Sequence, residues 1–134
     1  NFSLPLARRS GHVLGIEGES TLVKRAGDNA ARNGIENVDF RQADLAAIDG
    51  SEGWLKEQWD RLLLDPARSG AAAVVEHIDG IDPSRIVYVS CHPGTLARDA
   101  GSLVNNAGYT LEAAGIIDMF PHTAHVESIA VLRK

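Results

Sequence analysis

Short apolar runs alternate with helical patterns along this chain, and this alternation constrains its fold more than any other feature. Strands are predicted over 12–17, 38–42, 59–64, 86–89, 109–117 and 128–132. Helices are predicted at the start of the chain and over 20–32, 71–78 and 94–106, with a short helix inside the loop 46–58. Such alternation is typical of an α/β fold, a parallel sheet wrapped by helices.

Composition indicates one soluble globular domain over residues 1–134, because 44% of the residues are hydrophobic and 23% charged. The net charge of −5 disfavours nucleic-acid binding by charge alone. The single cysteine excludes an internal disulfide and a cysteine-built metal or cluster site, and it fits a reducing, cytoplasmic location. A membrane partner is not expected, because the apolar runs fall short of the roughly 20 residues of a membrane span.

The chain starts abruptly at Asn1, with neither an initiator Met nor a signal-peptide pattern. Its first seven residues, Asn-Phe-Ser-Leu-Pro-Leu-Ala, are typical of the opening turns of a helix whose preceding loop is absent. We therefore expect the chain to be the C-terminal piece of a longer protein.

Cys91 follows the apolar run 86–89, which is predicted to be a strand buried on both faces. Pro93 and Gly94 end that strand, and Thr95 is predicted to cap the next helix. Ligands of open α/β sheets bind outside the carboxyl ends of the strands, and a helix N-terminus favours a thiolate. Cys91 is therefore a candidate nucleophile, and an inert buried thiol is the alternative.

Three acids also follow predicted strands: Glu17, Asp44 and Asp65. Glu17 is placed to accept hydrogen bonds from ribose hydroxyls, and Asp44 from an adenine amino group. Asp65 could accept an N–H from a flat heterocycle. The alternatives are that Glu17 is a solvated acid at a strand end, that Asp44 is an ordinary loop residue, and that Asp65 is a turn acid paired with Arg68. In a parallel sheet these acids and Cys91 would line one crevice.

The segment 118–127 carries two histidines and Glu127 within six positions. The spacing differs from a helical H-E-x-x-H motif, and Pro121 opposes a helix, so no metal site is predicted. A carboxylate base held by a structured loop is favoured instead. Alternatively, His122 and His125 only tie the loop down.

Together these segments resemble the RNA uracil-5-methyltransferases that use S-adenosylmethionine, and especially the branch that acts on bacterial 23S ribosomal RNA. The resemblance covers nearly the whole chain, and its blocks are 1–7, 15–17, 63–70, 87–99 and 118–128.

The resemblance implies a Rossmann-like methyltransferase sheet and a mechanism for the full-length protein. The Cys91 thiolate would add to carbon 6 of a uracil in ribosomal RNA, and carbon 5 would take the methyl group. Glu127 would then remove the carbon 5 proton, and the target base would have to leave its stack. The resemblance also implies that Asn1, Glu17, Asp44 and Asp65 occupy positions in the cofactor pocket.

The chain departs from the family pattern in several places. His92 stands where the family usually has Asn, Gly94 where Ala is common, and Asp44 where some relatives have Asn. The family's first strand and glycine-rich loop are expected before Asn1, as are an RNA-binding barrel and, in this branch, often an iron–sulfur cluster. We therefore expect the parent to be a methyltransferase and this fragment to be inactive. The alternatives are another α/β enzyme with a Cys91 nucleophile and a non-catalytic fragment.

Overall fold

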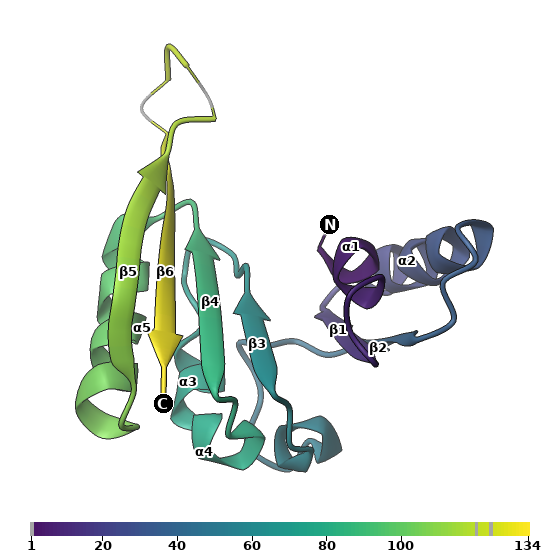
Figure 1. The fold of residues 1–134 in the computed structure, drawn as a ribbon, viewed down its shortest axis with the longest axis horizontal. Helices are drawn as coiled ribbons and strands as arrows, with labels where there is room; N and C mark the ends of the chain where they lie inside the picture. Colours follow the sequence, from purple (N-terminus) through teal and green to yellow (C-terminus); the bar gives the residue numbers. More distant parts are fainter. Residues whose placement is uncertain (1, 120, 124) are drawn as a thin grey trace. The chain divides into compact units, whose positions relative to one another are not determined.

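The computed structural model describes residues 2–119, 121–123 and 125–134, which form two compact units, Asn1–Ala47 and Ile48–Lys134. Both units combine helices with a β-sheet (Figure 1), so the predicted α/β class is confirmed. The expected single parallel sheet is wrong in detail. The described residues form a two-stranded and a four-stranded sheet, and the larger one is mixed.

The first unit contains one parallel pair of strands and two helices. Its elements are α1 (Ser3–Ala7), β1 (Val13–Glu17), α2 (Ser20–Arg32) and β2 (Val38–Gln42). The register runs from Val13 opposite Val38 to Glu17 opposite Gln42. Both helices contact the two strands. The carboxyl ends of β1 and β2 therefore lie at the same edge of this sheet.

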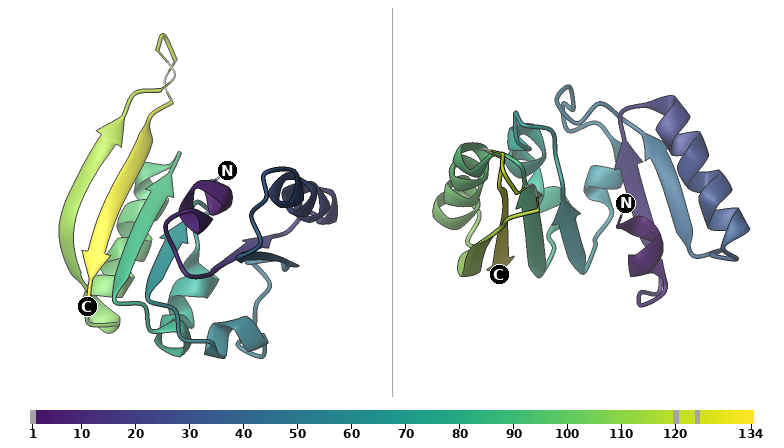
Figure 2. Two further views of the ribbon diagram at one scale, coloured as in Figure 1. Left: turned by 45° about the vertical axis from the view of Figure 1, so that its right-hand side comes forward. Right: turned by 90° about the horizontal axis from the view of Figure 1, so that it is seen from above.

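The second unit contains a four-stranded sheet in the order β3-β4-β6-β5. Its elements are η1 (Gly53–Lys56), β3 (Arg61–Leu64), α3 (Ala72–Glu76), α4 (Ile78–Ile81), β4 (Arg85–Ser90), α5 (Pro93–Asn106), β5 (Thr110–Ile117) and β6 (Glu127–Arg133). Strands β3 and β4 are parallel, whereas β6 lies between β4 and β5 and runs antiparallel to both. Figures 1 and 2 show that the described residues of the β5–β6 connection project beyond the carboxyl end of β4.

Two local predictions are also wrong. The helix expected over 71–78 is two short helices, α3 and α4, which meet at His77. The strand expected to be buried on both faces is buried on one. Ile86, Tyr88 and Ser90 are buried, while the alternate residues Val87 and Val89 are only half-buried. This alternation follows from a sheet in which one face receives the main helix packing.

Helix α5 lies along β4 and β6 and covers one face of the larger sheet (Figure 1). Ile86, Leu103, Ala130 and Leu132 are fully buried between these elements. Removing such side chains from water is the main favourable contribution to folding. Within the described residues, no helix has the length and apolar character needed to cross a membrane.

A buried polar network fixes the loop that follows β3. The Tyr88 hydroxyl donates to Asp99 Oδ2 at 2.6 Å, and the Ala71 N–H donates to Asp99 Oδ2 at 2.8 Å and to the Tyr88 hydroxyl at 3.0 Å. Burial, followed by the hydrogen bond to Asp99, raises the pKa of Tyr88 well above its usual value. The hydroxyl therefore stays protonated and keeps donating to the carboxylate.

Helix α5 also holds the loop through its exposed side. Arg98 pairs with Asp99, with Nη2 at 2.7 Å from Oδ1, and donates to the Ser69 carbonyl at 2.9 Å. Gly70 adopts φ +85°, and a Cβ atom there would lie 2.6 Å from both Arg98 Nη2 and Asp99 Oδ2. Because only glycine tolerates this conformation and this closeness, the end of the loop is fixed against α5.

We expect Tyr88→Phe to lower the free energy of unfolding by about 1–3 kcal/mol, because Asp99 loses a buried hydrogen-bond donor. The exchange of the Ala71 amide with solvent should also become faster, because the hydroxyl is one of its acceptors. Denaturant unfolding and hydrogen exchange measure these effects. Tyr109→Phe is the matched control, since that buried hydroxyl donates to the Pro83 carbonyl at 2.7 Å, outside the network. Equal Ala71 exchange rates in the two variants would contradict the assignment.

Candidate functional site

Three predicted site residues lie at one edge of the larger sheet. Asp65 directly follows β3, Cys91 directly follows β4, and Glu127 is the first residue of β6. Since β3 and β4 are parallel and β6 is antiparallel to β4, these three positions share an edge (Figure 1). Asp65 is exposed, while Cys91 and Glu127 are half-buried.

The pairing of β4 with β6 determines how Cys91 and Glu127 are placed. Ser90 pairs with Ser128 in the antiparallel register. Cys91 directly follows Ser90, and Glu127 directly precedes Ser128, so each is next in sequence to a member of this pair. The Ser128 hydroxyl strengthens this pairing by donating to the Ser90 carbonyl at 2.9 Å, and both serines are buried. Cys91 and Glu127 therefore lie at the same end of two neighbouring strands.

The backbone on each side of Cys91 is held by hydrogen bonds. The His92 N–H donates to Ser90 Oγ at 3.1 Å, and Ser90 Oγ lies 3.2 Å from the His92 carbonyl oxygen. The predicted Thr95 cap is wrong. His92 is the N-cap of α5, and its Nδ1 accepts the Thr95 N–H at 3.1 Å. The Thr95 hydroxyl instead lies 3.2 Å from the Arg68 carbonyl oxygen and 3.0 Å from that of His92.

These bonds join the loop after β3 to the turn after β4. The first turns of α5 hold the carbonyl oxygens of Arg68 and Ser69 and, through Asp99, the N–H of Ala71. The same helix begins directly after the Cys91 turn. The Asp65 loop and the Cys91 turn are therefore positioned by one helix.

Glu17 and Asp44 belong to the first unit, where they follow neighbouring parallel strands. Glu17 is exposed at the end of β1, and its Oε1 accepts the Glu19 N–H at 3.1 Å. Asp44 is exposed two residues beyond β2, and its Oδ1 accepts the Ala46 N–H at 3.0 Å. Both are carboxylates suited to accept hydrogen bonds from hydroxyl or amino groups of a nucleoside. Asn1, the remaining predicted cofactor residue, lies outside the described residues.

The two histidines before Glu127 are exposed in the connection between β5 and β6. His122 adopts a left-handed conformation with φ +69°, and the His125 N–H donates to the Thr123 hydroxyl at 3.2 Å. In the part of the chain that the structure describes, no three His, Cys, Asp or Glu side chains gather as a metal site would require. Glu127 itself is held in β6 rather than in this loop.

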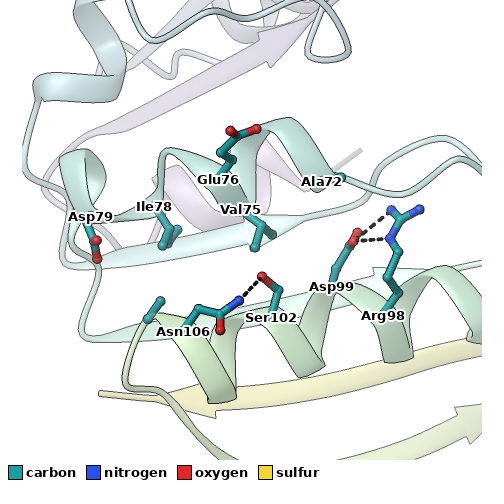
Figure 3. A pocket seen from close by; sticks show the side chains of 10 residues that line it. Ala72, Val75, Glu76, Ile78, Asp79, Arg98, Asp99, Ser102 and Asn106 are labelled. Atoms are coloured by element: carbon teal, nitrogen blue, oxygen red, sulfur yellow. Dashed lines mark hydrogen bonds and ion pairs between the residues drawn. The ribbon is translucent and has the colours of Figure 1, made fainter.

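A hollow of about 440 Å³ lies between α3, α4 and α5 (Figure 3). Arg98 and Asp99 form one end of it, and Ser102 and Asn106 line it from α5. Neither Cys91 nor the predicted cofactor residues belong to its lining. It borders the network that holds the loop after β3, and we do not assign it to the cofactor.

Sequence reasoning missed the residues that position this site. One usable signal was Asp99, which follows Leu96 by three positions and precedes Leu103 by four, so it lies on the apolar stripe of its helix. An acid on such a stripe needs buried partners. The roles of Ser90 and Ser128 carried no local signal, because the two are 38 positions apart.

Comparison with known proteins shows which family the chain resembles. The chain is 58% identical over 134 residues to a 23S rRNA (uracil(1939)-C(5))-methyltransferase, RlmD, of Stenotrophomonas maltophilia. It is 56% identical to the protein of the same name from Alkalilimnicola ehrlichii. Each match covers 100% of this chain, which spans 30% of the length of these curated relatives.

Solved structures show the same fold. The Pyrococcus abyssi tRNA (uracil-54, C5)-methyltransferase, in complex with S-adenosyl-L-homocysteine, has a TM-score of 0.79 and 32% identity, over 98% of this chain and 31% of that chain. M. jannaschii TYW2, in complex with AdoMet, has a TM-score of 0.71 and 18% identity, over 99% of this chain and 64% of that chain, which supports the Rossmann-like methyltransferase fold alone. A family model described as tRNA (Uracil-5-)-methyltransferase matches residues 1–134. The chain therefore belongs to the tRNA (uracil-5-)-methyltransferase family.

Proposed function

We propose that the full-length protein containing this chain methylates carbon 5 of a uracil in ribosomal RNA, with Cys91 as the nucleophile and Glu127 as the base. The observation that supports the proposal is the pairing of Ser90 with Ser128, which are the sequence neighbours of Cys91 and Glu127. The ribosomal substrate is inferred from the names of the curated relatives. Such a substrate would place the protein in the cytoplasm.

The proposed chemistry overcomes the low nucleophilicity of carbon 5 of uracil. The Cys91 thiolate forms a bond to carbon 6, and the electron pair of the double bond makes carbon 5 nucleophilic. S-adenosylmethionine, when bound, supplies an electrophilic methyl group to that carbon. Glu127 then accepts the carbon 5 proton, the double bond re-forms, and the Cys91 thiolate leaves. Both residues end the cycle ready to begin again, once Glu127 has released its proton.

We propose Asn1, Glu17, Asp44 and Asp65 as cofactor-binding residues. Glu17 and Asp44 fit this role because both are exposed carboxylates after parallel strands, where they can accept hydrogen bonds from ribose and adenine. Asp65 has a loop that α5 holds in place and could also contact the target uracil. An iron–sulfur cluster in the full-length protein would need cysteines from elsewhere, because this chain contains one.

We further propose that this segment alone does not catalyse methyl transfer, since it spans 30% of the length of its curated relatives. The competing hypothesis is that the protein is another α/β enzyme in which Cys91 is the nucleophile. A cysteine hydrolase would need a histidine base for the thiol. His92 is poorly suited, because its Nδ1 already accepts the Thr95 N–H.

We expect Cys91→Ala to abolish methyl transfer in the full-length protein while leaving cofactor affinity nearly unchanged. The reason is that carbon 5 stays unreactive without addition at carbon 6. Transfer of labelled methyl groups from S-adenosylmethionine to unmodified ribosomal RNA measures activity, and calorimetric titration with S-adenosylhomocysteine measures binding. Measurable turnover by this variant would falsify the nucleophile assignment.

We expect Glu127→Gln to slow resolution of the covalent adduct by about 10²- to 10⁴-fold, the usual contribution of a general base. A methylated protein–RNA adduct should then accumulate on denaturing gels. Glu112→Gln is the matched control, because Glu112 lies on β5 of the same sheet and pairs with Arg85 and Arg133. Normal turnover of the Glu127 variant without an adduct would show that Glu127 is only structural.

A further inference from the structure

The His92 ring lies in the space that a side chain at Gly94 would enter, and both residues follow Cys91 closely in the sequence. The His92 side chain caps α5 by accepting the Thr95 N–H at Nδ1, 3.1 Å away. The accepting nitrogen carries no proton, so the proton of the neutral ring is on Nε2. The ring is therefore held in one orientation by the first turn of the helix.

Gly94 provides the space that this ring occupies. A Cβ atom at Gly94 would lie 3.1 Å from Cε1 of His92 and 3.5 Å from its Nδ1. The nearer distance is below the roughly 3.5–4.0 Å at which carbon atoms pack without repulsion. An added methyl group would therefore require the His92 ring, which accepts the Thr95 N–H, to shift by a few tenths of an ångström. The helical conformation does not itself require glycine here, because no positive φ occurs at this position.

His92, the residue that caps α5, is also one of the two residues that hold the backbone on either side of Cys91. Ser90 Oγ lies within hydrogen-bond distance of both backbone groups of His92, and the Ser90 carbonyl accepts from Ser128. Cys91 is the single residue between Ser90 and His92. A shift of the His92 ring would therefore be transmitted through the His92 backbone to the position of the Cys91 sulfur.

We propose that His92 is a positioning residue for Cys91, and that the glycine at position 94 leaves the space that the His92 ring needs for this role. The positioning role rests on the proposed function of Cys91 as a nucleophile. An asparagine side chain caps helices well and is smaller than an imidazole ring. His92→Asn should therefore keep the cap and remove the need for glycine at position 94.

The test is a double-mutant cycle in the full-length protein, with methyl transfer to ribosomal RNA, alkylation of Cys91 by iodoacetamide and exchange of the Thr95 amide as readouts. We expect His92→Ala to lower kcat about fivefold, the effect of losing one helix cap, with the KM for S-adenosylmethionine unchanged. Thr95 exchange should become faster. Cys91 alkylation should slow at least twofold, because the sulfur is no longer held at the amino end of α5. His92→Asn should restore all three.

The sign of the Gly94→Ala effect should depend on residue 92. With His92 present, Gly94→Ala should lower kcat and speed Thr95 exchange, although alanine is the better helix former. Combined with His92→Asn, the same change should be neutral or favourable. Gly101→Ala is the matched control, because it lies in the same helix with open space around its Cβ position and should be neutral in both backgrounds.

Two results would overturn the proposal. One is a Gly94→Ala effect of equal size in both backgrounds, and the other is a His92→Ala variant with wild-type kcat and Cys91 alkylation. If the wild-type protein methylates no RNA, the proposed function fails. Alkylation and amide exchange then still decide whether His92 positions Cys91, because neither needs substrate.

Discussion

The antiparallel pairing of β6 with β4 is the constraint on which the rest of the larger unit depends. It inserts the last strand between β4 and β5 and brings the start of β6 to the carboxyl end of β4. The Ser90–Ser128 pair then brings Cys91 and Glu127 to the same end of neighbouring strands, although the two are far apart in sequence. Without this reversal of direction, the chain would have its thiol and its carboxylate at opposite edges of the sheet.

Helix α5 supplies the second constraint. Its first turns hold the loop that carries Asp65, and its N-terminus is capped by His92, the residue after Cys91. Its buried carboxylate, Asp99, is satisfied by Tyr88 and by the backbone of the same loop. A buried charge of this kind is costly unless it is paired and hydrogen-bonded, so the network favours one arrangement of the two loops. The site is thus positioned by a strand pair and by a helix.

Sequence predicted the elements better than their arrangement. The helix over 20–32 and the strand over 38–42 have the predicted bounds, because local periodicity defines both. Periodicity does not encode strand direction, so the antiparallel β6 was missed. The His92 cap was also missed, because Thr belongs to the residue types favoured at caps. Cys91 and Glu127 were found as candidates from their places in the sequence, whereas their location at the same end of neighbouring strands depends on a pairing between distant residues.

The central claim is that Cys91 bonds to carbon 6 of a uracil whose carbon 5 proton Glu127 removes. It is tested most directly with ribosomal RNA carrying 5-fluorouracil, because fluorine at carbon 5 cannot leave as a proton and the adduct cannot resolve. The full-length protein is incubated with this RNA and S-adenosylmethionine, digested, and mapped by mass spectrometry. The account predicts a methylated fluorouracil bonded to the Cys91 sulfur. An adduct on another residue, or none from a protein that methylates ordinary RNA, would contradict it.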